Sequence, residues 1–216
     1  MYTTGVTTPR ALIVDYGGVL TNPLAEVMAG WLRDDRIDAK RFRSLMREWL
    51  SADSVRNIAH DLETGRLAPA EFERLLAVRL SRADGTAPEA EGLLARMFAG
   101  FRADTGMVGA VRRARQAGVR TGLLSNSWGQ DYPRDGWADL FDDTVISGEV
   151  GLRKPDPAIY LHACSRLGVP PEDCVFVDDL RPNVRAAVAV GMVGVHHTDP
   201  EATLVELEIL FGLPLR

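Results

Sequence analysis

Cysteine is scarce in this chain: Cys164 and Cys174 are the only two among 216 residues. They do not form a cluster with histidine at the spacing of a zinc site, so we expect no zinc. Cys164 falls in a predicted helix, and Cys174 opens a predicted strand. Two buried free thiols in a reducing cytosol are therefore expected, with a bridge between them as the alternative.

The chain also lacks an excess of positive charge and any long apolar run. Its formal net charge is −5, which provides no basic field to attract nucleic acid or an anionic membrane. No apolar run approaches the roughly 20 residues of a membrane-spanning helix, and the first ten residues lack the basic-then-apolar order of a signal peptide. We predict a cytoplasmic protein without nucleic-acid or membrane partners. Nothing in the sequence indicates an oligomeric state.

Lysine is nearly missing. Of 25 basic residues only Lys40 and Lys154 are lysines, so arginine is the usual cation of this chain. Lys154, in the loop GLRKPDP, is therefore a candidate for a task that needs a compact ammonium instead of a planar guanidinium. A solvated loop lysine is the alternative.

Strand and helix patterns alternate from about residue 108 to the end of the chain. Apolar runs indicate strands at 119–124, 145–146, 174–177 and 192–196, and helical patterns lie between them at 108–117, 157–167, 182–190 and 201–211. Asp156, Pro157 and Gly168 are typical of the two ends of helix 157–167. This alternation predicts an α/β fold with a Rossmann-like, doubly wound parallel sheet.

The segment 22–104 has a different pattern. Apolar residues such as Phe42, Leu45 and Trp49 recur at helical spacing, and no convincing strand is present. We predict an inserted all-helical cap over residues 22–104 that covers the strand ends, and a core built from 1–21 and 105–216. Trp31 and Trp49 are expected to pack inside the cap.

Acidic residues follow two of the predicted strands. Asp15 ends the first apolar run and precedes a Gly-Gly turn, and Asp178 and Asp179 follow strand 174–177. Chemistry in open α/β sheets collects at the carboxyl ends of the strands. Three carboxylates gathered there would repel one another unless a cation lay among them. The sequence therefore predicts a magnesium site with a carboxylate nucleophile; a turn-capping Asp15 and helix-capping acids are the alternatives.

In chain order, four segments resemble the motifs of the haloacid dehalogenase superfamily, in particular its members with a helical cap after the first motif. The segments are Asp15, Ser125-Asn126, Lys154 and Asp178-Asp179. The stretches LLSNSWG, GLRKPDPAIY and VFVDDLRPNV are most similar to the amino-terminal phosphatase domain of soluble epoxide hydrolases. The resemblance implies a magnesium-dependent phosphatase that hydrolyses a small phosphomonoester.

The resemblance also implies roles for the residues at the motif positions. Asp15 would accept the phosphoryl group as an aspartyl-phosphate, with Lys154 between it and the later acids. Ser125 and Asn126 would donate to the phosphoryl oxygens, and Trp128 would contact the substrate.

The metal ligands implied by the resemblance are the carboxylates of Asp15 and Asp179 and the carbonyl of Gly17. Asp178 would either bind the ion or orient water and Lys154, and Asn183 would hold a metal-bound water or polarise the loop.

One position departs from the pattern. Phosphatases of the superfamily usually carry a second Asp two residues after the nucleophile, and this chain has Gly17 there. A general acid typically contributes about 10²–10⁴-fold to the rate. We therefore expect either slow turnover that favours good leaving groups or another group that supplies the proton. Gly17 also favours an alternative, a catalytically silent module that binds a phosphate ligand or a protein. A 2-haloacid dehalogenase is the other alternative, although Gly17 and Asp178-Asp179 differ from its pattern.

Overall fold

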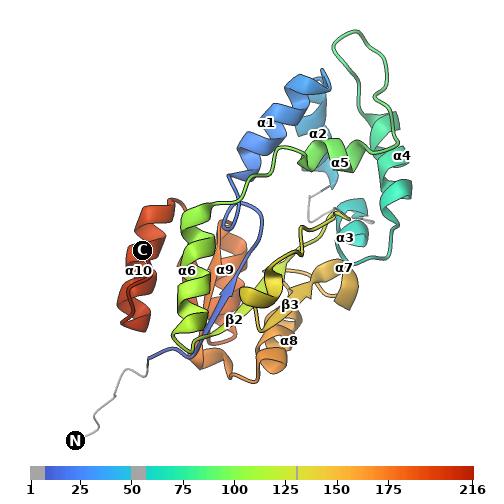
Figure 1. The fold of residues 1–216 in the computed structure, drawn as a ribbon. Coiled ribbons are helices and arrows are strands. Elements are labelled where there is room, and N and C mark those ends of the chain that lie inside the picture. Colours follow the sequence, from blue (N-terminus) through green and yellow to red (C-terminus); the bar gives the residue numbers. More distant parts are fainter. Residues whose placement is uncertain (1–7, 50–56, 130) are drawn as a thin grey trace, which may run out of the picture.

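The computed structural model describes residues 8–49, 57–129 and 131–216, and the described residues form a parallel sheet of five strands (Figure 1). The strands are β1 (Ala11–Val14), β2 (Arg120–Ser125), β3 (Asp143–Ile146), β4 (Cys174–Asp178) and β5 (Val193–His196), in the spatial order β3-β2-β1-β4-β5. Chain order reverses between β1 and β4. At such a switch point open α/β sheets bind their ligands.

Helices cover both faces of the sheet, as the predicted α/β fold requires (Figure 1). The four helices are α6 (Thr105–Gln116), α8 (Pro157–Leu167), α9 (Arg181–Ala189) and α10 (Pro200–Phe211). In β1, Leu12 and Val14 pack with α6 and α10, while Ala11 and Ile13 pack with α8 and α9. This alternation follows the two-residue period of a strand. Because both faces of the sheet are covered, the central strand β1 is apolar and buried at all four positions.

The predicted ends of α8 are confirmed. The Asp156 side chain accepts a hydrogen bond from the Ala158 N–H at 2.9 Å, and Pro157 occupies the first helical position. Gly168 follows the helix in the left-handed conformation, with φ of 67°, which glycine adopts without steric cost. The helix presents Cys164 to the sheet, where its Sγ atom lies 3.7 Å from that of Cys174. Both thiols are buried and free, as predicted.

Between β1 and α6 the described residues contain helices and no strand. These helices are α1 (Leu24–Asp34), α2 (Ala39–Trp49), α3 (Ile58–Glu63), α4 (Pro69–Arg79) and α5 (Leu93–Phe98). They lie beyond the carboxyl ends of the strands (Figure 1) and share an apolar cluster that includes Trp31 and Trp49. Residues 50–56 of the predicted cap lie outside the described residues, as do residues 1–7 of the predicted core.

The chain leaves the sheet and returns to it at one place. Thr21 and Ala103 form an isolated antiparallel bridge, and the Asp104 N–H donates to the Leu20 carbonyl at 2.9 Å. The two crossings coincide with the limits of the predicted cap, although the division into two domains stays a prediction. Within the described ranges, no helix has both the length and the apolar character needed to cross a bilayer.

Candidate active site

Acidic side chains from β1 and β4 meet at the switch point of the sheet. Val14 pairs with Val177, and the Asp15 N–H donates to the Val177 carbonyl at 2.9 Å. This register brings Asp15 beside Asp178. One carboxylate oxygen each from Asp15, Asp178 and Asp179 lies within 4.8 Å of the others. The convergence expected from the sequence is present.

A buried ammonium joins two of these acids. Lys154 Nζ lies 2.7 Å from Asp15 Oδ1 and 2.7 Å from Asp178 Oδ2, and 1% of the Lys154 side chain is exposed. The Phe176 ring also lies close to the ammonium, with its centroid 5.6 Å from Nζ. Buried charges are tolerated when they are paired and hydrogen-bonded. Lys154 thus fixes the orientation of Asp15 by holding one of its oxygens.

Asp178 is fully buried and its oxygens are already hydrogen-bonded. Oδ1 accepts from the Leu180 N–H at 2.8 Å and from Asn183 Nδ2 at 3.0 Å, while Oδ2 accepts from Lys154. Because these donors already occupy both oxygens, the geometry suits a residue that positions Lys154 better than a residue that binds a metal ion. Between the two roles that the resemblance left open, the geometry favours orientation.

Asp179 is more exposed than Asp178 and reaches the cavity beside Asp15. Its carboxylate needs a glycine opposite it. A Cβ atom on Gly18 would lie 2.7 Å from Asp179 Oδ2, and Gly18 has a φ of +80°. Both the close approach and the left-handed backbone exclude a side chain at this position.

Burial and crowding change the proton affinity of the site. Burial raises the pKa of Asp15 to about 7; Lys154 opposes this rise and Asp178 adds to it. Burial and the neighbouring Asp178 raise the pKa of Asp179 to about 6. Burial lowers the pKa of Lys154, but Asp15 and Asp178 outweigh burial and hold that pKa above its usual range. Three carboxylates and one ammonium leave an excess of negative charge, which a divalent cation would compensate.

Polar residues at the carboxyl end of β2 complete the floor of the site. Asn126 Oδ1 accepts from the Lys154 N–H at 2.8 Å, and Asn126 Nδ2 donates to the Lys154 carbonyl at 3.0 Å. One amide hydrogen that the resemblance assigns to the phosphoryl group is therefore used to hold the Lys154 backbone.

The Ser125 hydroxyl lies 2.9 Å from the Tyr132 hydroxyl. Burial raises the pKa of Tyr132 to about 12, so this phenol stays protonated and hydrogen-bonds Ser125. No sequence pattern pointed to Tyr132.

These groups open into a cavity of about 390 Å³ between the strand ends and the helices above them. Seven of the eight residues selected from the sequence line it: Asp15, Gly17, Ser125, Asn126, Trp128, Lys154 and Asp179. The eighth, Asp178, has no exposed surface and lies behind the cavity lining, paired with Lys154. Asn183 also lines the cavity. This volume lies in the range of small-molecule sites, about 300–1,000 Å³.

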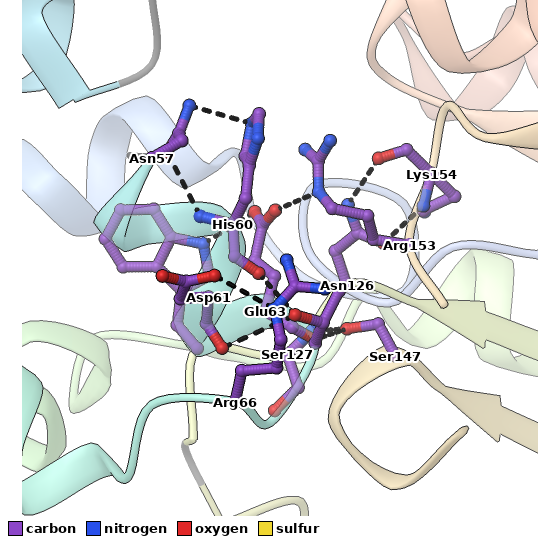
Figure 2. Close-up of polar contacts among 12 residues, drawn as sticks. Asn57, His60, Asp61, Glu63, Arg66, Asn126, Ser127, Ser147, Arg153 and Lys154 are labelled. Atoms are coloured by element: carbon purple, nitrogen blue, oxygen red, sulfur yellow. Dashed lines mark hydrogen bonds and ion pairs between the residues drawn. The ribbon is translucent and has the colours of Figure 1, made fainter. Parts of the chain in front are cut away.

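Two charged residues in the lining were missed by the sequence analysis. Figure 2 shows Glu63, at the end of α3, meeting Arg153, whose Nε donates to Glu63 Oε2 at 2.5 Å. Glu63 Oε1 accepts from Trp128 Nε1 at 3.0 Å, and the Ser147 hydroxyl donates to the Glu63 carbonyl. Arg153 could have been considered because it precedes Lys154, whereas nothing in the sequence distinguished Glu63 from other helix acids.

The chain is similar in sequence to several known proteins. A family model described as haloacid dehalogenase-like hydrolase matches residues 9–191. The chain is 30% identical to the sesquiterpene phosphatase astK of Aspergillus oryzae, over 95% of this chain and 98% of that protein. It is 32% identical to the bifunctional epoxide hydrolase 2 of Rattus norvegicus, over 49% of this chain but 21% of that enzyme.

A solved structure of similar fold comes from Bacteroides thetaiotaomicron. It is a HAD family enzyme in complex with magnesium and inorganic phosphate, with a TM-score of 0.66 and 20% identity. The match covers 88% of this chain and 94% of that one. At this identity the likeness concerns the fold.

Replacing Lys154 by Met tests the buried ion group. The variant keeps the apolar stem but leaves Asp15 and Asp178 without their cation. We expect the free energy of unfolding at pH 8, without divalent ions, to fall by about 3–5 kcal/mol in urea titrations. The loss should shrink towards pH 5, because Asp15, whose pKa burial raises to about 7, is then protonated and the site carries less unbalanced negative charge.

Lys40→Met is the matched control, since it removes the other lysine of the chain, which is exposed on α2. This variant should unfold like the wild type. Equal stability of Lys154→Met and Lys40→Met at pH 8 would contradict a structural role for the buried ammonium.

Proposed function

The chain belongs to the haloacid dehalogenase-like hydrolases, and from this premise we propose that it is a magnesium-dependent phosphatase of small phosphate monoesters. The observation that carries the proposal is the cavity floor, where Asp15 lies beside Asp179 and is held by Lys154. The name of astK, a phosphatase that aligns with nearly the whole chain, supports the same reaction class. A carboxylate, a fixed ammonium and hydroxyl and amide donors are what phosphoryl transfer needs.

The donor set fits a magnesium ion. Asp15 and Asp179 offer carboxylate oxygens and Gly17 a carbonyl, which are the hard ligands that Mg²⁺ prefers. Burial, with a smaller contribution from the neighbouring Asp178, raises the pKa of both Asp15 and Asp179, and a bound cation would favour their ionised forms. When bound, the ion would supply positive charge against the phosphoryl oxygens and the carboxylates.

In the proposed reaction, Asp15 attacks phosphorus and forms an aspartyl-phosphate while the bond from phosphorus to the alcohol oxygen breaks. Water then cleaves the aspartyl-phosphate, which releases inorganic phosphate and restores Asp15. Lys154 keeps the Asp15 carboxylate in one orientation and neutralises part of the charge that gathers there. The Ser125 hydroxyl, held by Tyr132, donates towards the phosphoryl oxygens.

Gly17 supports a second candidate function. Without an acid at this position, the alcohol must take its proton from water or from another group. The same site would also suit a silent module that binds a phosphate ligand without turnover. The two candidates differ in a single observable, the hydrolysis of a phosphate ester by clean protein.

Asp15→Asn tests the proposed nucleophile. With Mg²⁺ and p-nitrophenyl phosphate as substrate, we expect steady hydrolysis by the wild type and a loss of about 10³-fold or more in the variant. Asp139→Asn, which changes an exposed acid outside the cavity, is the control and should keep full activity. Hydrolysis that survives Asp15→Asn would exclude Asp15 as nucleophile, and none by the wild type would favour the silent module. Chloride release from a 2-chloro acid without magnesium would instead indicate a dehalogenase.

The thermal effect of magnesium should depend on pH. In the folded protein the pKa of Asp15 is raised to about 7 and that of Asp179 to about 6. Without a metal ion, the folded protein is therefore stabilised while both carboxyl groups are protonated, and it loses this stability as the pH rises through 6 to 7. Magnesium should therefore raise Tm strongly at pH 8 and weakly at pH 5.5, where protons compete for the same oxygens. Differential scanning fluorimetry with NaCl at equal ionic strength as control measures this difference. Equal shifts at both pH values would contradict the assigned ligands.

Gly17→Asp tests whether a missing general acid limits turnover. A Cβ atom at Gly17 would lie 3.5 Å from the Phe101 ring, which is an ordinary van der Waals contact. We expect kcat for an alkyl phosphate to rise by ~10²-fold, and less for p-nitrophenyl phosphate, whose leaving group needs no proton. Gly17→Asn has the same size without the acid and should give no gain. An unchanged kcat in Gly17→Asp, with magnesium binding intact, would show that the proton comes from elsewhere.

A further inference from the structure

The cavity is polar at one end and apolar at the other. Its floor is made by polar side chains at the strand ends. Its remaining wall is made mostly by apolar side chains from α1, α2, α5 and the loops after α5 and β2. These are Leu24, Met28, Phe42, Met46, Met97, Phe98, Phe101 and Trp128. Whatever is attached to a phosphoryl group on the floor must therefore lie among hydrocarbon surfaces.

Aromatic rings give this wall a fixed shape. The rings of Phe98 and Phe101 are stacked with centroids 5.5 Å apart. Trp128 packs edge-on against Phe72 at 5.6 Å and against Phe98 at 6.4 Å. Met28 and Met46 are half-buried beside them, and their unbranched side chains adapt to irregular apolar ligands.

The cavity lining holds one further ion pair besides the charged groups of the floor. Among the described residues, Glu63 and Arg153 are the remaining ionisable side chains of this lining. They pair at 2.5 Å, and 8% of the Glu63 side chain and 22% of the Arg153 side chain are exposed. The second oxygen of Glu63 accepts from the Trp128 indole (Figure 2 shows Glu63 and Arg153). A partly buried ion pair of this kind presents no net charge to a ligand.

From this arrangement, and resting on the proposed function, we propose that the substrate is the phosphate monoester of an apolar, uncharged alcohol with an extended hydrocarbon chain. Glu63 is the specificity-determining residue, because it neutralises Arg153 and so removes a site for a second anionic group. A sugar or nucleotide would bring several hydroxyl or amide groups into this wall, where each group without a partner would cost binding free energy.

Binding of alkylphosphonates tests the ligand class without turnover. Isothermal titration calorimetry with Mg²⁺ and butyl-, hexyl-, octyl- and decylphosphonate should show Kd falling about threefold to fourfold per methylene until the cavity is full. The heat-capacity change should become more negative with length, the signature of buried apolar surface. A Kd independent of chain length, or tighter binding of glucose 6-phosphate or AMP than of octylphosphonate, would overturn the proposal.

Substitutions in the apolar wall test whether the alkyl chain of the ligand binds there. Met28→Gln and Met46→Gln keep the side-chain length but add an amide, and each should reduce the gain per methylene. Ile209→Gln, at a residue on α10 that is 77% exposed, is the matched control and should leave the series unchanged. The same loss in the control as in the two cavity variants would remove the support for this wall as the binding surface.

Glu63→Gln tests the cancelled charge. The variant keeps an acceptor for Arg153 but leaves its positive charge unbalanced, so the ratio of affinities for 7-carboxyheptylphosphonate over octylphosphonate should rise about tenfold or more. The control is Glu48→Gln, which breaks a charged contact with Arg79 on the surface and should not change the ratio. An unchanged ratio in Glu63→Gln would overturn the role of Glu63.

Hydrolysis of p-nitrophenyl phosphate by the same preparation separates the two proposals. Hydrolysis together with length-independent binding would leave the phosphatase standing and overturn the apolar substrate. Length-dependent binding without any hydrolysis would overturn the phosphatase while supporting the ligand class.

Discussion

The ammonium of Lys154, 2.7 Å from both Asp15 and Asp178, is the interaction on which the rest of the site depends. Carboxylates removed from water at a sheet end are costly unless a cation is paired with them. The surrounding structure supports this pairing. Asn126 hydrogen-bonds the Lys154 backbone, and the Asn183 amide donates to both carboxylate oxygens of Asp178. Asp178 thus fixes the position of the Lys154 ammonium, and the ammonium in turn holds Asp15 facing the cavity in a single orientation.

The cavity divides its two tasks between two parts of the fold. The strand ends supply the charged and polar groups, which are fixed by the ladder of the sheet and its switch point. The helices between β1 and α6 supply most of the apolar wall, together with Phe101 and Trp128 from the loops after α5 and β2. Glu63 links the two parts, because it belongs to α3 but pairs with Arg153 and Trp128 from the core loops. Glu63 therefore connects the helical part of the cavity to the loop that carries Lys154.

Gly17 and the apolar wall together describe the kind of enzyme that we propose. An alkyl alcohol is a poor leaving group, and without an acid at position 17 its departure is slow. Hydrocarbon contacts to Met28, Met46 and Phe42 would bind the ester and its transition state about equally, which lowers KM without raising kcat. A binder of apolar phosphate esters that turns over slowly reconciles these two features. Gly17 is also the residue that supports the alternative of a silent binding module.

The sequence alone determined the α/β alternation, the helical insert and the residues at the strand ends. These features depend on local periodicity, on caps such as Asp156, and on the rule that parallel strands share one carboxyl edge. The sequence also favoured free thiols over a bridge and predicted Trp31 and Trp49 as packing residues, and the structure agrees with both. Only the tertiary structure decided that Asp178 supports Lys154 and that Asn126 holds its backbone. Contacts such as that between Glu63 and Arg153, 90 residues apart, have no local pattern, because they arise from how separate elements pack.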